Sequence, residues 1–265
     1  MGLDPDKVTF YRQSDVPETF ELFTILTNLT PKGYMNRAHA YKAAVARNQE
    51  QGRDADDDVN MGLFSYPLLM AADILLFSAD LVPVGRDQVQ HVEVARDIAQ
   101  AFNRLYGDVL RVPEIHLSEA PAIAGLDGRK MSKSYHNTIP LLSAGSDELR
   151  KVVRRYKTDS APANAPKDAD ASPLFQIFRE LAPASDVALV RDALLTGAMT
   201  WGALKDRLFE VLESLLSGPR DEYRRLIGDP EEVDRILAAG SARARPGAAA
   251  LVQRVREAMG ATLGR

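Results

Sequence analysis

A strand–turn–helix unit near the middle of the chain limits the folds that this sequence can adopt. Leu81 to Gly85 reads as a short strand, and residues 86–88 lead into a helix with apolar side chains at helical spacing: Val92, Ala95, Ala99 and Phe102. Such units build the parallel sheet of an α/β fold, in which ligands bind at the carboxyl ends of the strands. Gly85 would let a nucleotide approach the backbone there, beside a helix amino terminus that favours anions. Asp87 either caps the helix or contacts the ligand.

An apolar helix precedes this strand and carries a single charged residue. The sequence predicts this helix over residues 66–79, with Pro67 in its first turn, where a missing N–H costs little. Because the helix is apolar on most sides, we expect it to be buried, with Asp73 in its middle. A carboxylate in such a place needs a partner, which is either an internal cap or ion pair or a ligand donor. Met70 and Tyr66 on the same face would suit an indole, which offers one N–H donor and no acceptor.

Two lysines three residues apart, Lys130 and Lys133, follow a segment with two glycines. Glycine permits backbone conformations that other residues avoid, and the compact lysine ammonium can follow an anion whose charge shifts during a reaction. An isolated pair of this kind is more typical of a basic surface turn. The full run of residues 125–134 instead favours a glycine-loosened loop that binds phosphate and closes over a nucleotide.

Composition narrows the classes of protein and site. The chain has 265 residues, 45% of them hydrophobic, which is enough for one large domain or two modest ones. It contains no cysteine, which excludes disulfides, thiolate zinc sites and iron–sulfur clusters. Arg53 to Asp58 holds four aspartates without the ligand spacing of an EF-hand, so we expect a mobile, solvated loop and no metal site. Aspartates and prolines interrupt the most apolar stretch, residues 63–84, which predicts no membrane span and a cytoplasmic protein.

The formal net charge of −4 gives no global attraction for nucleic acid, so an RNA partner would have to meet a local basic patch. One candidate patch lies in residues 241–265, where Glu257 is the single acid. A solvated, arginine-rich terminal helix is the alternative interpretation. The basic residues of this patch are Arg243, Arg245, Arg254, Arg256 and Arg265.

Local patterns predict further elements on both sides of these motifs. We expect a strand over residues 7–12 in the middle of a sheet, and helices over residues 17–29 and 36–48. A proline- and alanine-rich linker, residues 158–171, separates this part from an all-helical region. There we expect an amphipathic helix after Thr200, with Trp201 as a core anchor. Separate helices are expected near residues 219–226, 230–239 and 248–259.

Three motifs in order, residues 62–75, 82–91 and 125–134, resemble the bacterial tryptophanyl-tRNA synthetases, which are class I aminoacyl-tRNA synthetases. The last motif resembles the KMSKS loop of that class. The likeness extends over essentially the whole chain, including residues 13–17 and 158–160. It implies an α/β fold, in which residues 1–160 form a partial Rossmann-type parallel-sheet domain. Residues 161–265 would form a carboxyl-terminal α-helical, anticodon-binding-like domain.

The resemblance also implies roles for particular residues. Asp73 would receive the indole N–H of tryptophan, Lys130 and Lys133 would stabilise pyrophosphate, and Lys42 is a candidate phosphate contact. The implied tryptophan-binding residues are Tyr66, Met70, Asp73, Val82, Val84 and Gln88. The implied ATP-binding residues are Gly85, Arg86, Asp87, Ile123, Lys130, Met131, Ser132, Lys133 and Ser134.

The implied function is ATP-dependent activation of L-tryptophan and its transfer to tRNA(Trp). ATP would enter as its Mg²⁺ complex, with no tightly bound cofactor, and the protein would be a homodimer. The family's HIGH-type signature is not found in this sequence, so we expect impaired activity in the chain as given. His39, His91, His116 and His136 do not replace it, and His91 is expected on a helix surface. A non-catalytic tRNA- or partner-binding module is the alternative.

Overall fold

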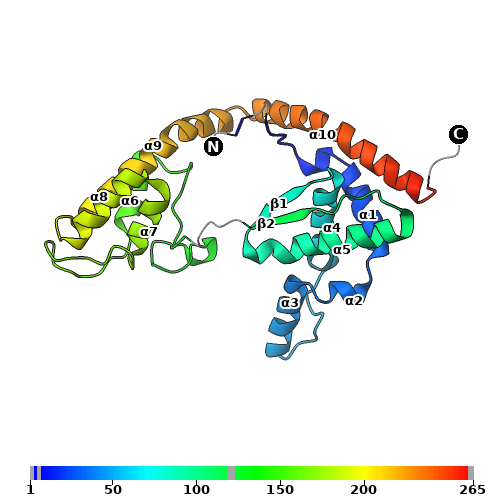
Figure 1. Cartoon of the computed structure of the whole chain (residues 1–265), viewed down its shortest axis with the longest axis horizontal. Coiled ribbons are helices and arrows are strands. Elements are labelled where there is room, and N and C mark those ends of the chain that lie inside the picture. Colours follow the sequence, from blue (N-terminus) through cyan, green and yellow to red (C-terminus); the bar gives the residue numbers. More distant parts are fainter. Residues whose placement is uncertain (1–2, 5–6, 118–122, 262–265) are drawn as a thin grey trace. The chain divides into compact units, whose positions relative to one another are not determined.

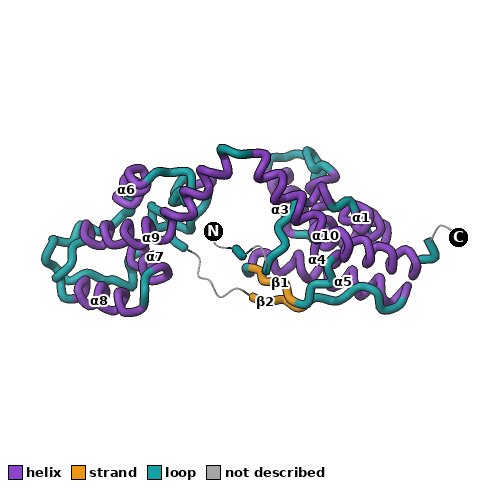
Figure 2. The backbone as a smooth tube through the Cα atoms, turned by 90° about the horizontal axis from the view of Figure 1, so that it is seen from above, coloured by secondary structure: helices purple, strands orange, loops and turns teal. Residues whose placement is uncertain are grey.

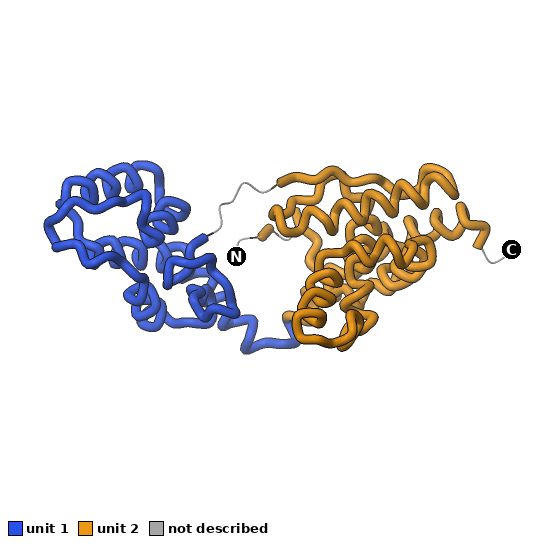
Figure 3. Tube along the Cα trace, turned by 90° about the horizontal axis from the view of Figure 1, so that it is seen from below, with its two compact units in different colours: residues 1–2, 121–232 blue, residues 3–120, 233–265 orange. Residues whose placement is uncertain are grey.

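The computed structural model describes residues 3–4, 7–117 and 123–261. They form two compact units, shown in Figure 3: unit 1 lies within residues 121–232, and unit 2 within residues 3–120 and 233–265. These units differ from the two functional domains expected from the sequence, which divide the chain between residues 160 and 161. That functional division stays a prediction. Among the described residues, no helix combines the length and the apolar character that a membrane crossing requires.

Unit 2 contains a small parallel sheet with a helical crossover (Figures 1 and 2). These elements are β1 (Leu81–Val84), the 3-10 turn η2 (Arg86–Gln88), α5 (Val89–Tyr106) and β2 (Glu114–Leu117). The strands pair in parallel, with Leu81 opposite Glu114. A parallel pair needs such a crossover, because its strands run in the same direction. The predicted strand–turn–helix unit and the α/β class are therefore confirmed.

Helices supply most of the core of unit 2. They are η1 (Gln13–Asp15), α1 (Glu18–Leu29), α2 (Lys32–Met35), α3 (His39–Glu50), α4 (Met61–Leu76), α5, and α10 (Pro230–Ala258) from residue 233 on. Helix α4 packs against both α1 and α5. Apolar side chains of α1, α4, α5 and α10 form one core: Leu22, Leu26, Ala71, Leu75, Ala95, Phe102, Ala248 and Val255. The helix predicted over residues 17–29 is confirmed, and the one predicted over residues 36–48 begins at His39.

Helix α4 begins earlier than predicted. The Asn60 side chain caps it by accepting a hydrogen bond of 2.8 Å from the Leu63 backbone N–H. Pro67 consequently lies inside the helix, and not in its first turn as expected. Burial overrides the local cost of this proline, because Pro67 and Leu68 are both buried.

The strand predicted over residues 7–12 is wrong, since these residues form no strand in the structure. The segment instead lies along α10, where Arg243 donates to the Val8 carbonyl at 3.3 Å. The Phe10 carbonyl approaches Gly240 so closely that an added Cβ would come within 1.7 Å of its oxygen. β-Propensity favours a strand only where a neighbouring strand is available for pairing, and a helix offers no such partner.

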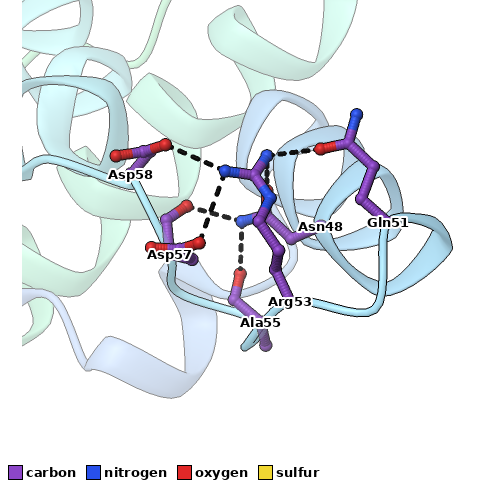
Figure 4. Close-up of polar contacts among 6 residues, drawn as sticks. All are labelled: Asn48, Gln51, Arg53, Ala55, Asp57 and Asp58. Atoms are coloured by element: carbon purple, nitrogen blue, oxygen red, sulfur yellow. Dashed lines mark hydrogen bonds and ion pairs between the residues drawn. The ribbon is translucent and has the colours of Figure 1, made fainter.

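The acidic segment after α3 is a loop, as predicted, but internal hydrogen bonds hold it (Figure 4). The Arg53 guanidinium contacts Asp58 at 2.9 Å, Asp57 at 3.3 Å and the Asn48 side-chain oxygen at 2.9 Å. Asn48, only 2% exposed, donates to the Ala55 and Asp57 carbonyls. An arginine thus neutralises part of the acidic charge that the sequence presents.

Unit 1 is helical around its own core. Its elements are η3 (Lys133–Tyr135), α6 (Ser146–Arg154), α7 (Pro173–Leu181), α8 (Ala184–Leu195) and α9 (Trp201–Ile227). The Thr200 side chain caps α9, and Trp201 is buried with its indole N–H donating to Asp159 at 2.7 Å. The predicted core role of Trp201 is therefore confirmed.

The predicted break between a helix near residues 219–226 and one beginning at residue 230 is confirmed, since α9 ends at Ile227 and α10 begins at Pro230. The predicted breaks before residue 219 and before residue 248 are wrong. Helix α9 continues through Pro219, and α10 continues through Pro246. A proline removes one helical hydrogen bond, but other contacts can hold the helix together. In α9 the buried Arg220 forms a bidentate pair with Glu213, at 2.9 and 3.0 Å, which spans the turn at Pro219.

Candidate functional site

The carboxylate of Asp73 is half-buried on α4 and has one internal partner. Its Oδ2 accepts a hydrogen bond of 2.7 Å from Gln13 Nε2, whereas its buried Oδ1 has no hydrogen-bond partner among the described residues. Burial raises the pKa of Asp73, and the Gln13 hydrogen bond opposes this rise. The site therefore presents one buried acceptor that is ready for a donor.

Sequence reasoning predicted that Asp73 needs a partner but missed Gln13, which lies 60 positions away. Burial and then the negative charge of Asp73 raise the pKa of a second neighbour, Tyr11. Neither neighbour could be found from the helix pattern alone. Both come from the segment that the sequence suggested was a strand and the turn that follows it.

Tyr66, on the predicted pocket face of α4, contacts His91 of α5. Its hydroxyl lies 2.9 Å from His91 Nε2. Burial and then the nearby His39 lower the pKa of His91, so its imidazole is neutral near pH 7. The helix-surface role expected for His91 is wrong, because the ring is buried between two packed helices. His91 lies four residues before the buried Ala95 and therefore on the same face of α5, which was a signal in the sequence that the ring is buried.

Along β1, successive side chains point to opposite faces, and the two faces differ in burial. Val82 and Val84 share the more buried face, while Leu81 and Pro83 are exposed. This arrangement makes the two valines available as apolar walls beside the turn that follows.

The turn after β1 differs in detail from the expectation. Gly85 has a φ of −72°, and an added Cβ would meet only the flexible Asp87 carboxylate, at 2.9 Å. Asp87 accepts from the Gln88 side chain at 3.1 Å, and neither η2 nor α5 begins with a side-chain cap. The capping alternative for Asp87 is therefore not supported. Arg86 and Asp87 are exposed, and Gln88 is half-buried.

Lys42, the candidate phosphate contact, lies on α3 at a cavity of about 270 Å³ within unit 2. Arg37 and His39 line the same cavity, as do the acidic Glu93 and Asp97. The charge around Lys42 is therefore mixed, and its contact with phosphate stays a prediction.

The lysine loop, residues 123–134, is more ordered than a glycine-loosened segment. Ala124 and Lys130 form an antiparallel bridge, and the Met131 N–H donates to the Ile123 carbonyl at 2.9 Å. Gly128 has a φ of +85°, so the tip requires glycine. The loop is a hydrogen-bonded hairpin within unit 1.

The side chains of this hairpin point to different environments. Met131 packs against the core of unit 1, while Lys130 and Lys133 are exposed. Arg129 is occupied, because it donates to Asp127 at 2.7 Å and its guanidinium lies 4.6 Å from the centre of the Tyr135 ring. No described carboxylate forms an ion pair with either lysine. Both ammonium groups are therefore available to an anion.

The predicted ATP contacts are divided between the two units. Gly85, Arg86 and Asp87 belong to unit 2, whereas Ile123 and the lysines of the loop belong to unit 1. Their meeting around one nucleotide stays a prediction. Sequence reasoning also missed the buried Asn137, which lies just after the loop.

The basic patch near the carboxyl end is largely used inside unit 2. Arg245 pairs with Glu18 at 3.1 Å, and Arg256 pairs with Glu21 through a hydrogen bond of 2.6 Å. Of the other members, Arg254 is exposed, and Arg265 lies outside the described residues. Most of the described arginines that suggested an RNA-binding surface therefore have partners within unit 2.

Comparison with known proteins agrees with this arrangement. Residues 1–217 match the family model for tRNA synthetases class I (W and Y). The tryptophan--tRNA ligase of Bordetella parapertussis is 54% identical over 261 residues, and that of Pseudomonas aeruginosa is 52% identical over 263 residues. Each match covers 98% of this chain but 58% of the relative, so the chain spans just over half the length of these curated relatives.

A solved structure gives the same result for the fold. The tryptophanyl-tRNA synthetase of Campylobacter jejuni, in complex with ADP and tryptophan, superposes with a TM-score of 0.86 and 39% identity. The match covers 98% of this chain and 79% of that one. The resemblance inferred from the three sequence motifs is confirmed: the chain belongs to the class I tRNA synthetases for tryptophan and tyrosine, within which it groups with the bacterial tryptophanyl-tRNA synthetases.

Proposed function

We propose that this chain acts in the ATP-dependent activation of L-tryptophan and its transfer to tRNA(Trp). The observation that carries the proposal is the buried Oδ1 of Asp73, which has no donor among the described residues. An acceptor of this kind suits an indole, which donates one hydrogen bond through its N–H and accepts none. The Campylobacter jejuni relative, solved with ADP and tryptophan, supports the same choice of ligands.

In this proposal the pocket for the amino acid lies in unit 2. Asp73 accepts the indole N–H, and the other side chains provide apolar walls and polar contacts around the ligand. Gln13 joins this set through its hydrogen bond to Asp73. The proposed tryptophan-binding residues are Tyr66, Met70, Asp73, Val82, Val84 and Gln88.

The nucleotide would be bound as its Mg²⁺ complex. The tryptophan carboxylate attacks the α-phosphorus of ATP and releases pyrophosphate, and a ribose hydroxyl of the tRNA then attacks the mixed anhydride and releases AMP. Both steps depend on positioning and charge stabilisation. Lys130 and Lys133 would stabilise the pyrophosphate. The other proposed ATP contacts are Gly85, Arg86, Asp87, Ile123, Met131, Ser132 and Ser134, with Lys42 as a further phosphate contact.

The proposal extends to partners and place of action. The protein would work as a homodimer in the cytoplasm, where its proposed substrates occur. A chain without cysteine has no disulfide that a reducing compartment could break. Residues 161–265 would contribute the anticodon-binding-like part, and residues 1–160 the catalytic part.

The test is single-turnover adenylate formation with Lys130→Ala and Lys133→Ala, in this chain and in a form that includes any upstream coding sequence. We expect each substitution to slow the chemical step, because about 2–4 kcal/mol of transition-state stabilisation is lost. Tryptophan affinity should be unchanged. Lys151→Ala is the matched control, because Lys151 is an exposed lysine on α6. A variant that loses tryptophan binding but keeps its chemical rate would refute the assigned role. Binding of tRNA without any adenylate formation would favour the non-catalytic module.

A further inference from the structure

Asn137 is a buried asparagine at the base of the lysine loop in unit 1, and it is only 2% exposed. Its Oδ1 accepts from the Ser132 backbone N–H at 2.8 Å. Its Nδ2 donates to Asp127 Oδ1 at 2.7 Å and to the Lys130 carbonyl at 3.2 Å. The Asn137 carbonyl accepts from the Leu126 N–H at 2.9 Å. One residue therefore contacts both arms of the hairpin.

The chemistry of these contacts requires an amide. The group that faces the Ser132 N–H must accept, and the group that faces a carboxylate and a carbonyl must donate. The hydrogen bond from Asn137, followed by those from Arg129, holds the pKa of Asp127 at about 2. Asp127 is therefore ionised near neutral pH and accepts only. An aspartate at position 137 would place a second carboxylate against it.

Gly125 allows Asn137 to occupy this position. A Cβ at residue 125 would lie 2.4 Å from both Cγ and Nδ2 of Asn137, and 2.7 Å from its carbonyl oxygen. These distances are too short for non-bonded atoms. The glycine before the lysines thus provides room for a buried side chain.

The consequence for the lysines is geometric. Asn137 fixes the carbonyl of Lys130 and the N–H of Ser132, and Met131 between them packs against the core. The backbone that carries the lysines is held, while both ammonium groups are exposed. Groups fixed before the ligand arrives need less reorganisation when charge develops.

We propose that Asn137 is a positioning residue, which sets the backbone of the lysine loop so that Lys130 and Lys133 present their ammonium groups to the pyrophosphate end of ATP. This inference rests on the proposed function of the loop. Asn137 acts through the backbone and does not itself touch the nucleotide.

Two variants separate hydrogen bonding from packing. Asn137→Asp keeps the size of the side chain and the acceptor for Ser132, but loses both donated bonds when ionised. Asn137→Ala removes all three side-chain bonds. His136→Asn is the matched control, because His136 is an exposed neighbour with a φ of 50°, which asparagine tolerates.

The first readout is hydrogen exchange of the Ser132 amide in the 265-residue chain, which needs no ligand. The indole N–H of Trp201, the single tryptophan of the chain, reports whether unit 1 remains folded. We expect Asn137→Ala to lose protection at Ser132 by roughly tenfold or more, because the acceptor is gone. We expect Asn137→Asp to lose protection as well, because its carboxylate is repelled by that of Asp127, with the Trp201 signal kept and the control unchanged in both cases. In tryptophan-dependent pyrophosphate exchange by the form that includes any upstream coding sequence, we expect kcat to fall by a similar factor and the KM for tryptophan to stay constant.

The outcomes distinguish this inference from the proposed function. Protection like that of the wild type in Asn137→Ala would overturn the inference, because the loop backbone would then be held without the Asn137 side chain. Loss of the Trp201 signal in both variants would also overturn it, because Asn137 would then support the whole unit. If Ser132 protection depends on Asn137 but the wild-type form that includes any upstream coding sequence shows no exchange activity, the loop-setting role stands and the proposed function fails.

Discussion

Replacement of Asp73 by asparagine isolates the acceptor that we assign to the tryptophan indole. In the wild type, Gln13 donates to Oδ2 at 2.7 Å and Oδ1 lacks a donor among the described residues. Asparagine is nearly the same size but has one accepting and one donating group. Because Gln13 donates at this position in the wild type, we expect the asparagine oxygen to turn toward it. The asparagine NH₂ then takes the position of Oδ1 and opposes the indole N–H.

The size of the effect follows from the lost hydrogen bond. A hydrogen bond to a charged group contributes about 1.5–3 kcal/mol, which corresponds to roughly 10- to 160-fold in affinity. We therefore expect Asp73→Asn to weaken tryptophan binding by at least this factor, because two donors would face one another. Benzothienylalanine, which has sulfur in place of the ring N–H, should bind equally well to both proteins.

Although Asp73→Asn should weaken tryptophan binding, it should stabilise the folded protein. Burial raises the pKa of Asp73, so the folded protein holds this proton more tightly than the unfolded chain does. The stability that the protonated group contributes is present at low pH and is lost as pH rises through its folded pKa. Asparagine resembles the protonated acid. We expect the Tm of Asp73→Asn, relative to wild type, to increase over that interval.

Calorimetric titration of both ligands, with thermal unfolding at about pH 4 and about pH 7, tests these expectations. A loss of tryptophan affinity that spares benzothienylalanine, in a protein that remains folded, supports the assignment. Equal losses for both ligands, or an unchanged affinity for tryptophan, would refute the reasoning. Asp73 would then be a structural partner of Gln13.

Three further predictions concern stability and protonation. Gly240→Ala should lower the free energy of unfolding by about 1–3 kcal/mol in urea titrations, because its Cβ would lie 1.7 Å from the Phe10 carbonyl oxygen. Gly247→Ala in the same helix meets nothing within 4 Å and should be neutral or stabilise by up to about 1 kcal/mol, so equal effects would contradict the packing argument. Asn48→Ala should cost about 1–3 kcal/mol, since two carbonyls lose their donor, and a urea midpoint like that of the wild type would show that the loop does not need it. NMR titration should give His91 a pKa below about 6.5, with stability falling as pH drops through that value, whereas a higher pKa would mean that the ring is not buried as described.

The sequence by itself determined the features that depend on near neighbours. The strand Leu81–Val84, the helix that follows it and the cap of α9 at Thr200 all follow from local periodicity and capping chemistry. The motif order also indicated the family, because ordered motifs together are more specific than a lysine pair alone. The need of Asp73 for a partner was predictable too, because a carboxylate within an apolar helix requires a donor.

Only the tertiary structure decided which residues meet. Gln13 reaches Asp73 across 60 positions, and Tyr66 reaches His91 across 25. Residues 7–12 have the composition of a strand, but they lie along α10, because the pairing of a segment depends on what is packed beside it. Asn137 is an unremarkable polar residue in the sequence and is a buried hydrogen-bonding centre in the fold. Propensity and periodicity report local energies, whereas burial and hydrogen-bond partners depend on contacts between distant segments, which exist only once the chain has folded.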